Sequence, residues 1–363
     1  MKILIDGREF EKGKLTGIGR FLKNVLAMLA PARPGWEFIL VLNQHGEFPD
    51  KYPNLKTAVI QERNTLFTDQ FTLSRLIRRE RAGLFYSPYY KCPVFANVPK
   101  IITIHDLTYF ILESSPHFNN KPLLLWHRII ARGASKIITV SENSANDISR
   151  LLNVSRDKIK VLYNTVSDSF VPRPGVEISK TLANHSIRKP YIVYVGNSKP
   201  HKNLKRLIEA FSLLPEKMRN AYSLVLAGVD PSILDEYPDK SGFAAIPFIP
   251  DEDLPALYSG AELMVFPSLY EGFGIPPVEA MACGCPVASS NVSCMPEILD
   301  DACVYFNPLD INDMSEKIQL LLSDKNLREE LSHNGRERAE RYRLKASVPR
   351  VLGIFDAFGV KHE

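Results

Sequence analysis

The sequence Pro-Ser-Leu-Tyr-Glu-Gly-Phe-Gly-Ile-Pro-Pro-Val-Glu, residues 267–279, connects a strand to a helix through a glycine loop. The apolar run before it, residues 263–266, is typical of a buried parallel strand. Residues 277–283 predict a short helix, because proline stands in its first turn and Gly284 follows its end. Between strand and helix, the backbone N–H groups of residues 272–274 are available to a ligand, and the helix dipole adds positive charge there. This stretch therefore predicts an anion site at the start of a helix.

Two carboxylates flank the glycine loop, Glu271 before the glycines and Glu279 in the first helical turn. Carboxylates beside a phosphate site are explained by a ligand that also carries hydroxyl groups, because hydroxyls need acceptors while a diphosphate needs donors. We therefore predict a nucleotide-sugar site, in which Glu279 binds the ribose and Glu271 binds the transferred sugar. The alternative is that both acids only complement the helix dipole. It accounts for Glu279 better than for Glu271.

The length and composition predict a globular protein with two domains. A chain of 363 residues is longer than one ordinary core, and its 45% hydrophobic and 24% charged content is that of a soluble protein. No apolar run approaches the ~18 residues of a spanning helix, and the chain opens as a strand rather than as a signal peptide. Five irregularly spaced cysteines favour reduced thiols over disulfides or a metal site. We therefore expect a cytoplasmic location.

The charge is unevenly distributed. Residues 1–170 carry 24 Lys and Arg against 15 Asp and Glu, whereas residues 171–363 carry 21 against 26. The excess gathers at residues 75–81 and at 121–136, the second beside the apolar run 123–126. Such faces favour an anionic membrane surface or a phosphorylated acceptor, so we expect peripheral contact with the inner face of the cell membrane. Ordinary solvated helix faces are the alternative. We expect no nucleic-acid partner.

Short apolar runs alternate with helical patterns along the chain, which predicts an α/β protein with parallel sheets. The first half contains the candidate strands Lys2–Asp6, Phe38–Leu42, Ala58–Gln61, Leu84–Ser87, Ile101–His105, Ile137–Val140 and Val161–Tyr163. The second half contains Tyr191–Val195, Leu224–Leu226, Ala244–Phe248, Leu263–Phe266, Val287–Ala288 and Val304–Phe306.

These strands predict two Rossmann-like domains with a break between them. We assign residues 1–170 to an N-terminal domain and 190–345 to a C-terminal domain that contains the predicted nucleotide-sugar site. Residues 171–189 lack a clear period and contain three Pro or Gly residues within 172–175, so we predict a linker. Residues 346–363 are expected to form a helix that packs back toward the first domain. Ligands of open α/β sheets bind beyond the carboxyl ends of the strands, which predicts a site in a cleft between the domains.

Two further candidates lie in the first half. Gly17 and Gly19 stand at a helix start after the first strand, where backbone donors can face phosphate. The loop is too long for the dinucleotide-binding fingerprint and the third glycine is absent, so a dehydrogenase is disfavoured. His105 ends a predicted strand, at the edge of the sheet where ligands usually bind. Ser141–Ser144 is interpreted as helix capping.

The second domain opens with a similar arrangement. Gly196 and Asn197 follow a strand, and Lys199 and Lys202 lead into a helix. A lysine at this position suits a diphosphate and can neutralise the charge on a leaving nucleoside diphosphate without a metal. After a later strand, an apolar residue at 248–249 is placed to cover a nucleobase, with Ile249 as the candidate. A capping box from Asp251 is the alternative there.

Together these motifs resemble the retaining glycosyltransferases of family 4, whose GT-B fold has two Rossmann-like domains facing across a cleft. The segment from Glu271 to Glu279 resembles their Glu-x7-Glu signature, and matching motifs cover nearly the whole chain. They are residues 16–21, 104–107, 161–164, 196–203, 227–228, 267–279, 284–286 and 289–297. The chain is most similar to bacterial enzymes of cell-surface polysaccharide synthesis, many of them mannosyltransferases or glucosyltransferases.

The resemblance implies a role for each matching residue. Glu279 would bind the ribose, Glu271 the 3- and 4-hydroxyls of the sugar, and Lys202 the diphosphate. His105 would contact the donor sugar near its 6-hydroxyl. The remaining donor-binding positions are Gly17 over the phosphates, together with Gly19, Gly196, Asn197, Ile249, Gly272, Phe273, Gly274 and Ile275.

The sequence departs from the family at two positions. Many members carry arginine where this chain has Asn197, and arginine often precedes the lysine where this chain has His201. Neutralisation of the diphosphate would then depend on Lys202, helped by Arg20 or Lys199. No acid cluster predicts a metal site, so we expect metal-independent transfer with no cofactor beyond the nucleotide-sugar donor.

The predicted reaction transfers a hexose, mannose or glucose, from a GDP- or UDP-sugar to a glycan or lipid-linked oligosaccharide. Two alternatives remain open on the sequence. A GT-B nucleotide-sugar epimerase would need no acceptor, and the Glu-x7-Glu pair argues against it. A non-catalytic nucleotide-sugar-binding protein would not need all four of Glu271, Glu279, Lys202 and His105.

Overall fold

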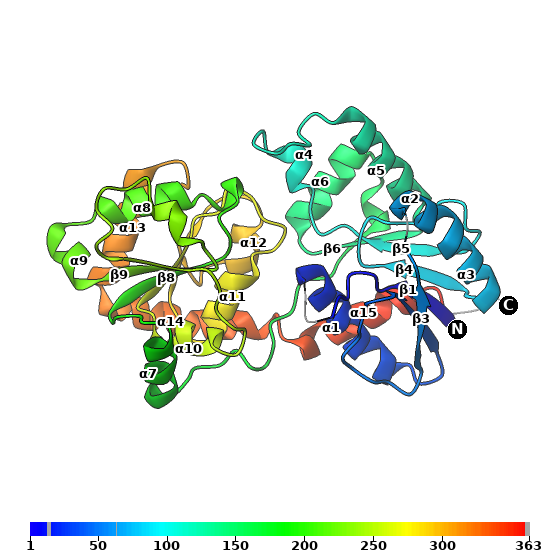
Figure 1. Cartoon of the computed structure of the whole chain (residues 1–363), viewed down its shortest axis with the longest axis horizontal. Helices are drawn as coiled ribbons and strands as arrows, with labels where there is room; N and C mark the ends of the chain where they lie inside the picture. Colours follow the sequence, from blue (N-terminus) through cyan, green and yellow to red (C-terminus); the bar gives the residue numbers. More distant parts are fainter. Residues whose placement is uncertain (13–15, 63, 360–363) are drawn as a thin grey trace. The chain divides into compact units, whose positions relative to one another are not determined.

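A computed structural model describes residues 1–12, 16–62 and 64–359 of the chain. It consists of two compact units, Met1–Thr165 with Leu344–Glu363, and Val166–Arg343 (Figure 1). Each unit contains one parallel sheet with helices packed against it. The prediction of an α/β protein with two Rossmann-like domains is confirmed.

The first unit is built on a sheet of seven strands in the order β3-β2-β1-β4-β5-β6-β7. Its central strands are buried on both faces, which explains their nearly continuous apolar sequences. The strands are β1 Lys2–Asp6, β2 Glu37–Asn43, β3 Leu55–Ile60, β4 Leu84–Ser87, β5 Lys100–Thr103, β6 Lys136–Thr139 and β7 Ile159–Val161.

The first unit contains helices from both ends of the chain. They are α1 Gly17–Ala32, α2 Thr65–Phe67, the π-helical turn η1 Thr68–Thr72, α3 Leu73–Glu80, α4 Thr108–Ile111, α5 Lys121–Gly133, α6 Glu142–Leu152, η2 Arg156–Lys158 and α15 Leu344–Asp356. α15 lies beside α1 (Figure 1). Arg33 Nε donates to Asp356 Oδ1 at 2.8 Å, and the Phe355 ring packs edge-on against Tyr86 at 5.2 Å. Residues 360–363, the end of the predicted C-terminal helix segment, lie outside the described residues.

The second unit is built on a sheet of six strands in the order β10-β9-β8-β11-β12-β13. The strands are β8 Tyr191–Val195, β9 Ser223–Ala227, β10 Phe243–Ile246, β11 Leu263–Phe266, β12 Val287–Ser290 and β13 Val304–Phe306. The helices are α7 Gly175–Asn184, η3 Pro200–Lys202, α8 Leu204–Ser212, α9 Glu216–Ala221, η4 Pro231–Leu234, α10 Leu254–Gly260, α11 Ile275–Ala282, α12 Met295–Leu299, α13 Ile311–Ser323 and α14 Lys325–Glu340. The thirteen strands of the described residues all lie where the sequence predicted strands: five have the predicted bounds, and eight differ by one to three residues at one or both ends.

The segment 171–189, which we expected to be a linker, contains α7. Ile178, Thr181 and Leu182 are buried on one face of this helix, which packs against α10. A hypothetical Cβ on Gly260 of α10 would lie 2.7 Å from Ile178 Cγ2, so the two helices approach closely. The prolines that indicated a linker lie just before the helix, where Pro174 occupies the N-cap position.

Candidate active site

Strand order places a topological switch point at the carboxyl edge of the second sheet. β8 pairs with β9 on one side and with β11 on the other, so the connections after β8 and β11 part at this point. Ligands of open α/β sheets bind at such a switch point. The loop after β8 contains residues 196–203, and the loop after β11 contains residues 267–274. The two main donor motifs predicted from the sequence therefore meet here.

The glycine loop has a conformation that only glycine accommodates. Gly274 is the N-cap of α11 and has φ 81°, and a Cβ on it would lie 2.4 Å from Met295 Cε. α11 begins at Ile275, with proline in its first turn as predicted, and the left-handed Gly284 follows its end. The first N–H groups of α11 have no carbonyl partner within the helix, so this end attracts anions.

Lys202 and Glu271 form an ion pair between the loop after β8 and the loop after β11. Lys202 Nζ lies 2.6 Å from Glu271 Oε1, and each side chain is only 14% exposed. The ammonium also lies 5.5 Å from the centre of the Phe266 ring. Ser293 holds the Glu271 backbone, since its Oγ donates to the Glu271 carbonyl oxygen at 2.7 Å and accepts from the Glu271 N–H at 3.2 Å. Lys202, which is predicted to bind the diphosphate, and Glu271, which is predicted to bind the sugar, are thus direct neighbours.

Asn203 fixes the geometry of that ion pair, a role not predicted from the sequence. Its backbone is left-handed, with φ 60°. Its Nδ2 donates to the carbonyl oxygens of Pro267 at 3.1 Å and Pro308 at 2.7 Å, and its Oδ1 accepts from Arg206 at 2.9 Å. This side chain ties the loop after β8 to the loop after β11. An asparagine directly before a helix was the available signal.

Glu279 is buried in α11, where it is 5% exposed. Tyr258 of α10 donates its hydroxyl to Glu279 Oε2 at 3.3 Å. Burial raises the pKa of Tyr258 well above its usual value, and the neighbouring Glu279 raises it further. The tyrosine therefore stays protonated and orients the carboxylate as an acceptor. Phe273, also predicted at the donor site, is 2% exposed and packs edge-on against Tyr342.

At the carboxyl ends of β8 and β9, the backbones of Gly196 and Gly228 lie close together. Gly228 has φ 84°, and a Cβ on it would lie 2.7 Å from the Gly196 carbonyl oxygen. The Asn197 carbonyl accepts from Tyr194 at 2.8 Å, and Asn197 Oδ1 accepts from the Lys199 N–H at 3.1 Å. The Asn197 side chain therefore shapes the turn.

The loop after β10 differs from the expectation in two respects. Ile249 is 7% exposed, so its side chain belongs to the interior, while the neighbouring Phe248 is 74% exposed. A capping box from Asp251 does not form, because α10 begins at Leu254 with Asp253 as its N-cap. Asp253 Oδ2 instead accepts from His185 Nε2 at 2.8 Å.

In the first unit, α1 begins at Gly17 and its start lies at the carboxyl edge of the sheet. The Gly19 N–H was predicted to donate a hydrogen bond to phosphate. It donates instead to Thr16 Oγ1 at 3.0 Å, as part of the helix cap. Gly17 is exposed, and a Cβ on it would have no atom within 4 Å. Of the two glycines, Gly17 has the open surroundings that a ligand needs.

His105 lies two residues beyond β5, at the same edge. Its Nε2 is 3.1 Å from the Pro88 carbonyl oxygen and therefore carries the proton, because a carbonyl only accepts. The ring packs edge-on against Phe21 of α1 at 5.0 Å. Burial lowers the pKa of His105 from its ordinary value, which favours a neutral imidazole with Nδ1 as acceptor. The sheet thus brings His105 and the start of α1 together.

A buried charge network at the end of β1 was not predicted from the sequence. Arg8 is 5% exposed and binds Asp6 through Nε at 2.8 Å and Nη2 at 2.7 Å. It also binds Asp69 at 2.5 Å and Glu62 at 3.1 Å. Asp69 lies in the π-helical turn η1, a feature that is often found near functional sites. This network makes the carboxyl end of β1 rigid. Elsewhere, Ser141 Oγ accepts from the Ser144 N–H at 3.0 Å, which confirms the predicted cap.

Residues 1–12, 16–62 and 64–359 contain neither a cluster of potential metal ligands nor a helix suited to crossing a membrane. No three His, Cys, Asp or Glu side chains cluster there as metal ligands would. Within the same ranges, no helix has the length and apolar character needed to cross a membrane.

Comparison with known proteins agrees with this geometry. A family described as Glycosyl transferases group 1 matches residues 179–338, and Glycosyltransferase Family 4 matches residues 15–170. The O-antigen chain mannosyltransferase B of Escherichia coli is 31% identical and covers 98% of this chain and 99% of its own length.

Solved structures share the fold at low sequence identity. Sucrose-phosphate synthase from Thermosynechococcus elongatus has a TM-score of 0.81 at 20% identity, covering 99% of both chains. Anabaena HepE in complex with UDP and glucose has a TM-score of 0.77 at 18% identity, covering 98% of this chain and 100% of its own. The protein is thus a two-domain α/β protein of the GT-B class. The chain belongs to the family 4 glycosyltransferases, and it is a glycosyltransferase.

Proposed function

We propose that the enzyme is a retaining hexosyltransferase that moves mannose or glucose from a nucleotide diphosphate sugar to a glycan or lipid-linked oligosaccharide. The observation that carries the proposal is the pairing of Lys202 with Glu271 beside the glycine loop. One cation, the positive N-terminal end of α11 and two carboxylates match a ligand that combines a diphosphate with sugar hydroxyls. Glu279, whose carboxylate accepts a hydrogen bond from Tyr258, is proposed to accept hydrogen bonds from the ribose hydroxyls.

The proposed reaction uses the donor itself as the base. The acceptor hydroxyl oxygen bonds to the anomeric carbon on the face from which the diphosphate oxygen leaves, and its proton passes to that leaving oxygen. Lys202 and the backbone of residues 272–275 stabilise the negative charge that develops on the diphosphate. Glu271 accepts from the sugar hydroxyls, and neutral His105 is proposed to accept from the 6-hydroxyl through Nδ1. The products are the glycoside and a nucleoside diphosphate.

The identity of donor and acceptor is inferred from relatives. A bacterial O-antigen mannosyltransferase aligned over almost the whole chain supports mannose and a polysaccharide acceptor. A fold neighbour solved with UDP and glucose keeps UDP-sugars in the proposal beside GDP-sugars. The basic excess of residues 1–170 supports peripheral contact with the anionic inner face of the cell membrane.

We propose that transfer needs no metal ion or other cofactor, because Lys202 and the α11 dipole supply the positive charge that the leaving group needs. Transfer should continue in EDTA at an unchanged rate. Lost activity that returns with manganese or magnesium would refute metal independence while leaving the transferase proposal intact.

The function is tested with a panel of GDP-, UDP- and ADP-sugars. Thermal unfolding should shift upward with one nucleotide class, and Glu279→Ala should abolish the shift. The same donor, incubated with isolated lipid-linked oligosaccharide, should yield a product with the donor's anomeric configuration by NMR. Free epimerised nucleotide sugar, or donor binding without transfer or hydrolysis, would refute the proposal.

A further inference from the structure

Two adjoining cavities of the second unit lie at the start of β10, which is at the amino edge of the sheet. They measure about 420 and 500 Å³, sizes that suit a small molecule. They share four lining residues, which are Arg219, Asn220, Ser241 and Phe243. The donor residues assigned in this unit lie at the opposite, carboxyl edge of the same sheet. The two cavities are therefore separate from the donor site.

The smaller cavity, called the basic lobe, has a positive lining. Arg188, Lys189 and Arg219 line it, and none of the described residues that line it is acidic. Arg188 and Lys189 are exposed, and neither forms an ion pair within the described part of the chain. The basic lobe thus offers three cations to an anionic ligand.

Arg219 of α9 is fixed where the two cavities meet. Its side chain is half-buried, and its Nε donates to the Leu214 carbonyl oxygen at 3.1 Å. Its two Nη nitrogens have no hydrogen-bond partner among the described residues, and Asp239 acts on its charge without forming an ion pair. Guanidinium N–H groups bind phosphate oxygens in pairs. An anchored guanidinium with two unused nitrogens therefore indicates a phosphate ligand.

The larger cavity, called the aromatic lobe, offers apolar surface for a flat ring. The ring of Phe243 packs edge-on against Phe211 at 5.2 Å, and both residues line the lobe. Tyr237, which is half-buried, and Leu213, which is 56% exposed, line it as well. Aromatic side chains bind nucleobases by stacking, with little dependence on which base is present.

Two carboxylates also line the aromatic lobe. Glu209 and Asp239 are exposed, and neither forms an ion pair within the described ranges. Asp239 Oδ1 accepts from the Ser241 N–H at 2.8 Å, which fixes this carboxylate and leaves Oδ2 for a ligand. A carboxylate oxygen is an acceptor for hydroxyl donors such as those of a ribose. The two lobes together therefore present partners for phosphate, base and sugar.

We propose that the two lobes form a second nucleotide site, which binds a nucleoside phosphate independently of the donor. The phosphate binds Arg219, with Arg188 and Lys189 beside it. The base lies against Tyr237, and the ribose hydroxyls donate to Asp239. A neutral glycan has no charge for the three cations, and inorganic phosphate leaves the aromatic lobe empty. A nucleoside phosphate uses both lobes.

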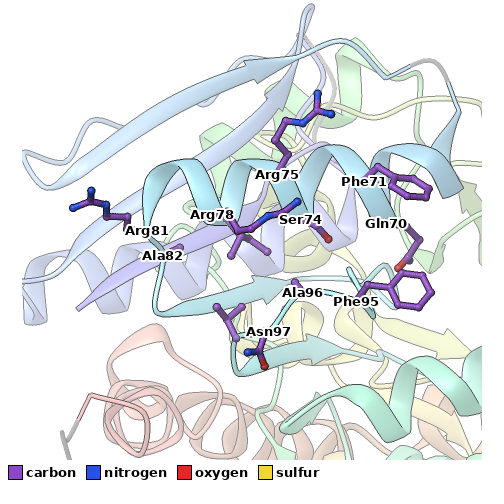
Figure 2. Close-up of a pocket in the computed structure, with 12 residues that line it drawn as sticks. Gln70, Phe71, Ser74, Arg75, Arg78, Arg81, Ala82, Phe95, Ala96 and Asn97 are labelled. Atoms are coloured by element: carbon purple, nitrogen blue, oxygen red, sulfur yellow. The ribbon is translucent and has the colours of Figure 1, made fainter.

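A cationic cavity of the first unit fits a nucleotide less well. It measures about 510 Å³ and lies between α3 and the segment 95–98 (Figure 2). Figure 2 shows Arg78 and Arg81 away from the end that Phe71 and Phe95 form. Both arginines are exposed and have no side-chain hydrogen bond among the described residues, so binding would cost more side-chain entropy than at the anchored Arg219. No described carboxylate lines this cavity to accept from a ribose. It serves here as the matched control.

Calorimetric titration of the full chain with GMP, UMP and AMP tests the proposal. At least one nucleotide should bind, and Arg219→Gln should weaken its binding about 10–100-fold, because a charged hydrogen-bond donor is lost. Arg219 also binds a backbone carbonyl, so Arg188→Gln with Lys189→Gln tests the basic lobe through exposed side chains and should weaken binding about three- to tenfold. Tyr237→Ala should weaken it about tenfold. If none of the three nucleotides binds, the proposal is overturned.

Glu279→Ala separates this site from the donor site. Nucleotide binding at the amino edge should persist in this variant, with hydrogen exchange slowed at residues 219–222 and 237–243 and unchanged at 272–279. Loss of all nucleotide binding in Glu279→Ala would overturn the proposal. If the donor site does not bind nucleotides, Arg219→Gln alone should remove the binding seen in the wild type. Failure of the transferase proposal and failure of this one therefore give different results.

Further controls test the specificity of the site. Arg78→Gln with Arg81→Gln removes two exposed charges from the cavity of the first unit and should leave nucleotide binding unchanged. A loss equal to that of Arg188→Gln with Lys189→Gln would refute a specific site. Inorganic phosphate that binds as tightly as the nucleotides would overturn the proposal in favour of a simple anion site. Binding of a mannose oligosaccharide without nucleotide binding would overturn it in favour of a glycan site.

Discussion

The Lys202–Glu271 ion pair can be tested by a double-mutant cycle on both stability and activity. The two side chains are 2.6 Å apart and 14% exposed, so removing one leaves the other charge partly buried and unpaired. Breaking a fully buried pair costs about 3–5 kcal/mol, and the residual exposure reduces the expected loss to about 2–3 kcal/mol. For a domain of this size this lowers the unfolding temperature by about 5–10 °C.

The cycle uses Lys202→Met, Glu271→Gln and the double variant. Each single change should lower the unfolding temperature, and the double variant should recover part of the loss because neither charge is then left alone. Transfer should behave differently. We expect about 10²–10³-fold lower turnover for Lys202→Met, because the leaving diphosphate loses its cation, and no recovery in the double variant.

A matched control is the exposed pair Lys205–Glu236, which has the same 2.6 Å separation but side chains 64% and 67% exposed. Lys205→Met should change neither the unfolding temperature nor turnover, because solvent screens an exposed pair. Recovery of turnover together with stability in the double variant would refute our reasoning, since the pair would then be purely structural. Unchanged turnover in Lys202→Met would remove Lys202 from the catalytic assignment.

Three further results are expected. Tyr258→Phe should raise KM for the donor about three- to tenfold with kcat unchanged, because Glu279 loses one hydrogen bond at 3.3 Å; an equal fall in kcat would contradict a pure positioning role. Gly274→Ala should cost at least about 1–3 kcal/mol of stability and abolish donor binding, since its φ is 81° and its Cβ would meet Met295 at 2.4 Å. Burial lowers the pKa of His105, so the unfolded chain binds more protons and stability should fall as pH drops below about 6.5. His105→Gln should reduce that slope in urea unfolding measured from pH 8 to 5.

Controls accompany the last two changes. Gly175→Ala, at a helix start with open space around it, should leave stability unchanged or slightly raised. A similar loss at both glycines would show that the backbone geometry of Gly274 is not the cause. In His105→Gln, part of the dependence of stability on pH should remain, because burial also lowers the pKa of His127. A slope identical to that of the wild type would mean that His105 does not titrate on unfolding.

The sequence predicted the strands well because parallel strands buried on both faces are continuous apolar runs bounded by glycine and proline. It predicted α7 poorly. Ile178, Thr181 and Leu182 have helical spacing, but three apolar-face positions are a weak signal beside Pro172 and Pro174. The packing of α7 on α10 stabilises a helix that local sequence only weakly favours.

The sequence named the residues of the candidate site but did not predict the contacts between them. Lys202 and Glu271 are 69 positions apart, and only the neighbouring placement of β8 and β11 brings them together. The same limit applies to Arg8, which binds acids from three segments. Ile249 illustrates the converse, because the sequence indicated an apolar residue at this loop without showing that Phe248 is the exposed one.

In the proposed donor site, the pairing of Lys202 with Glu271 compensates both charges before the donor binds. A lone ammonium or carboxylate at 14% exposure would be poorly solvated, so each stabilises the other until the donor arrives. The proposed nucleotide sugar would offer Lys202 a diphosphate with greater charge and would offer Glu271 hydroxyl donors. Both side chains then exchange one partner for another without becoming unpaired. A nucleoside diphosphate alone satisfies only Lys202, and the glycoside product alone satisfies only Glu271. The complete donor is therefore the ligand that compensates both charges at once, which favours its binding over that of either product.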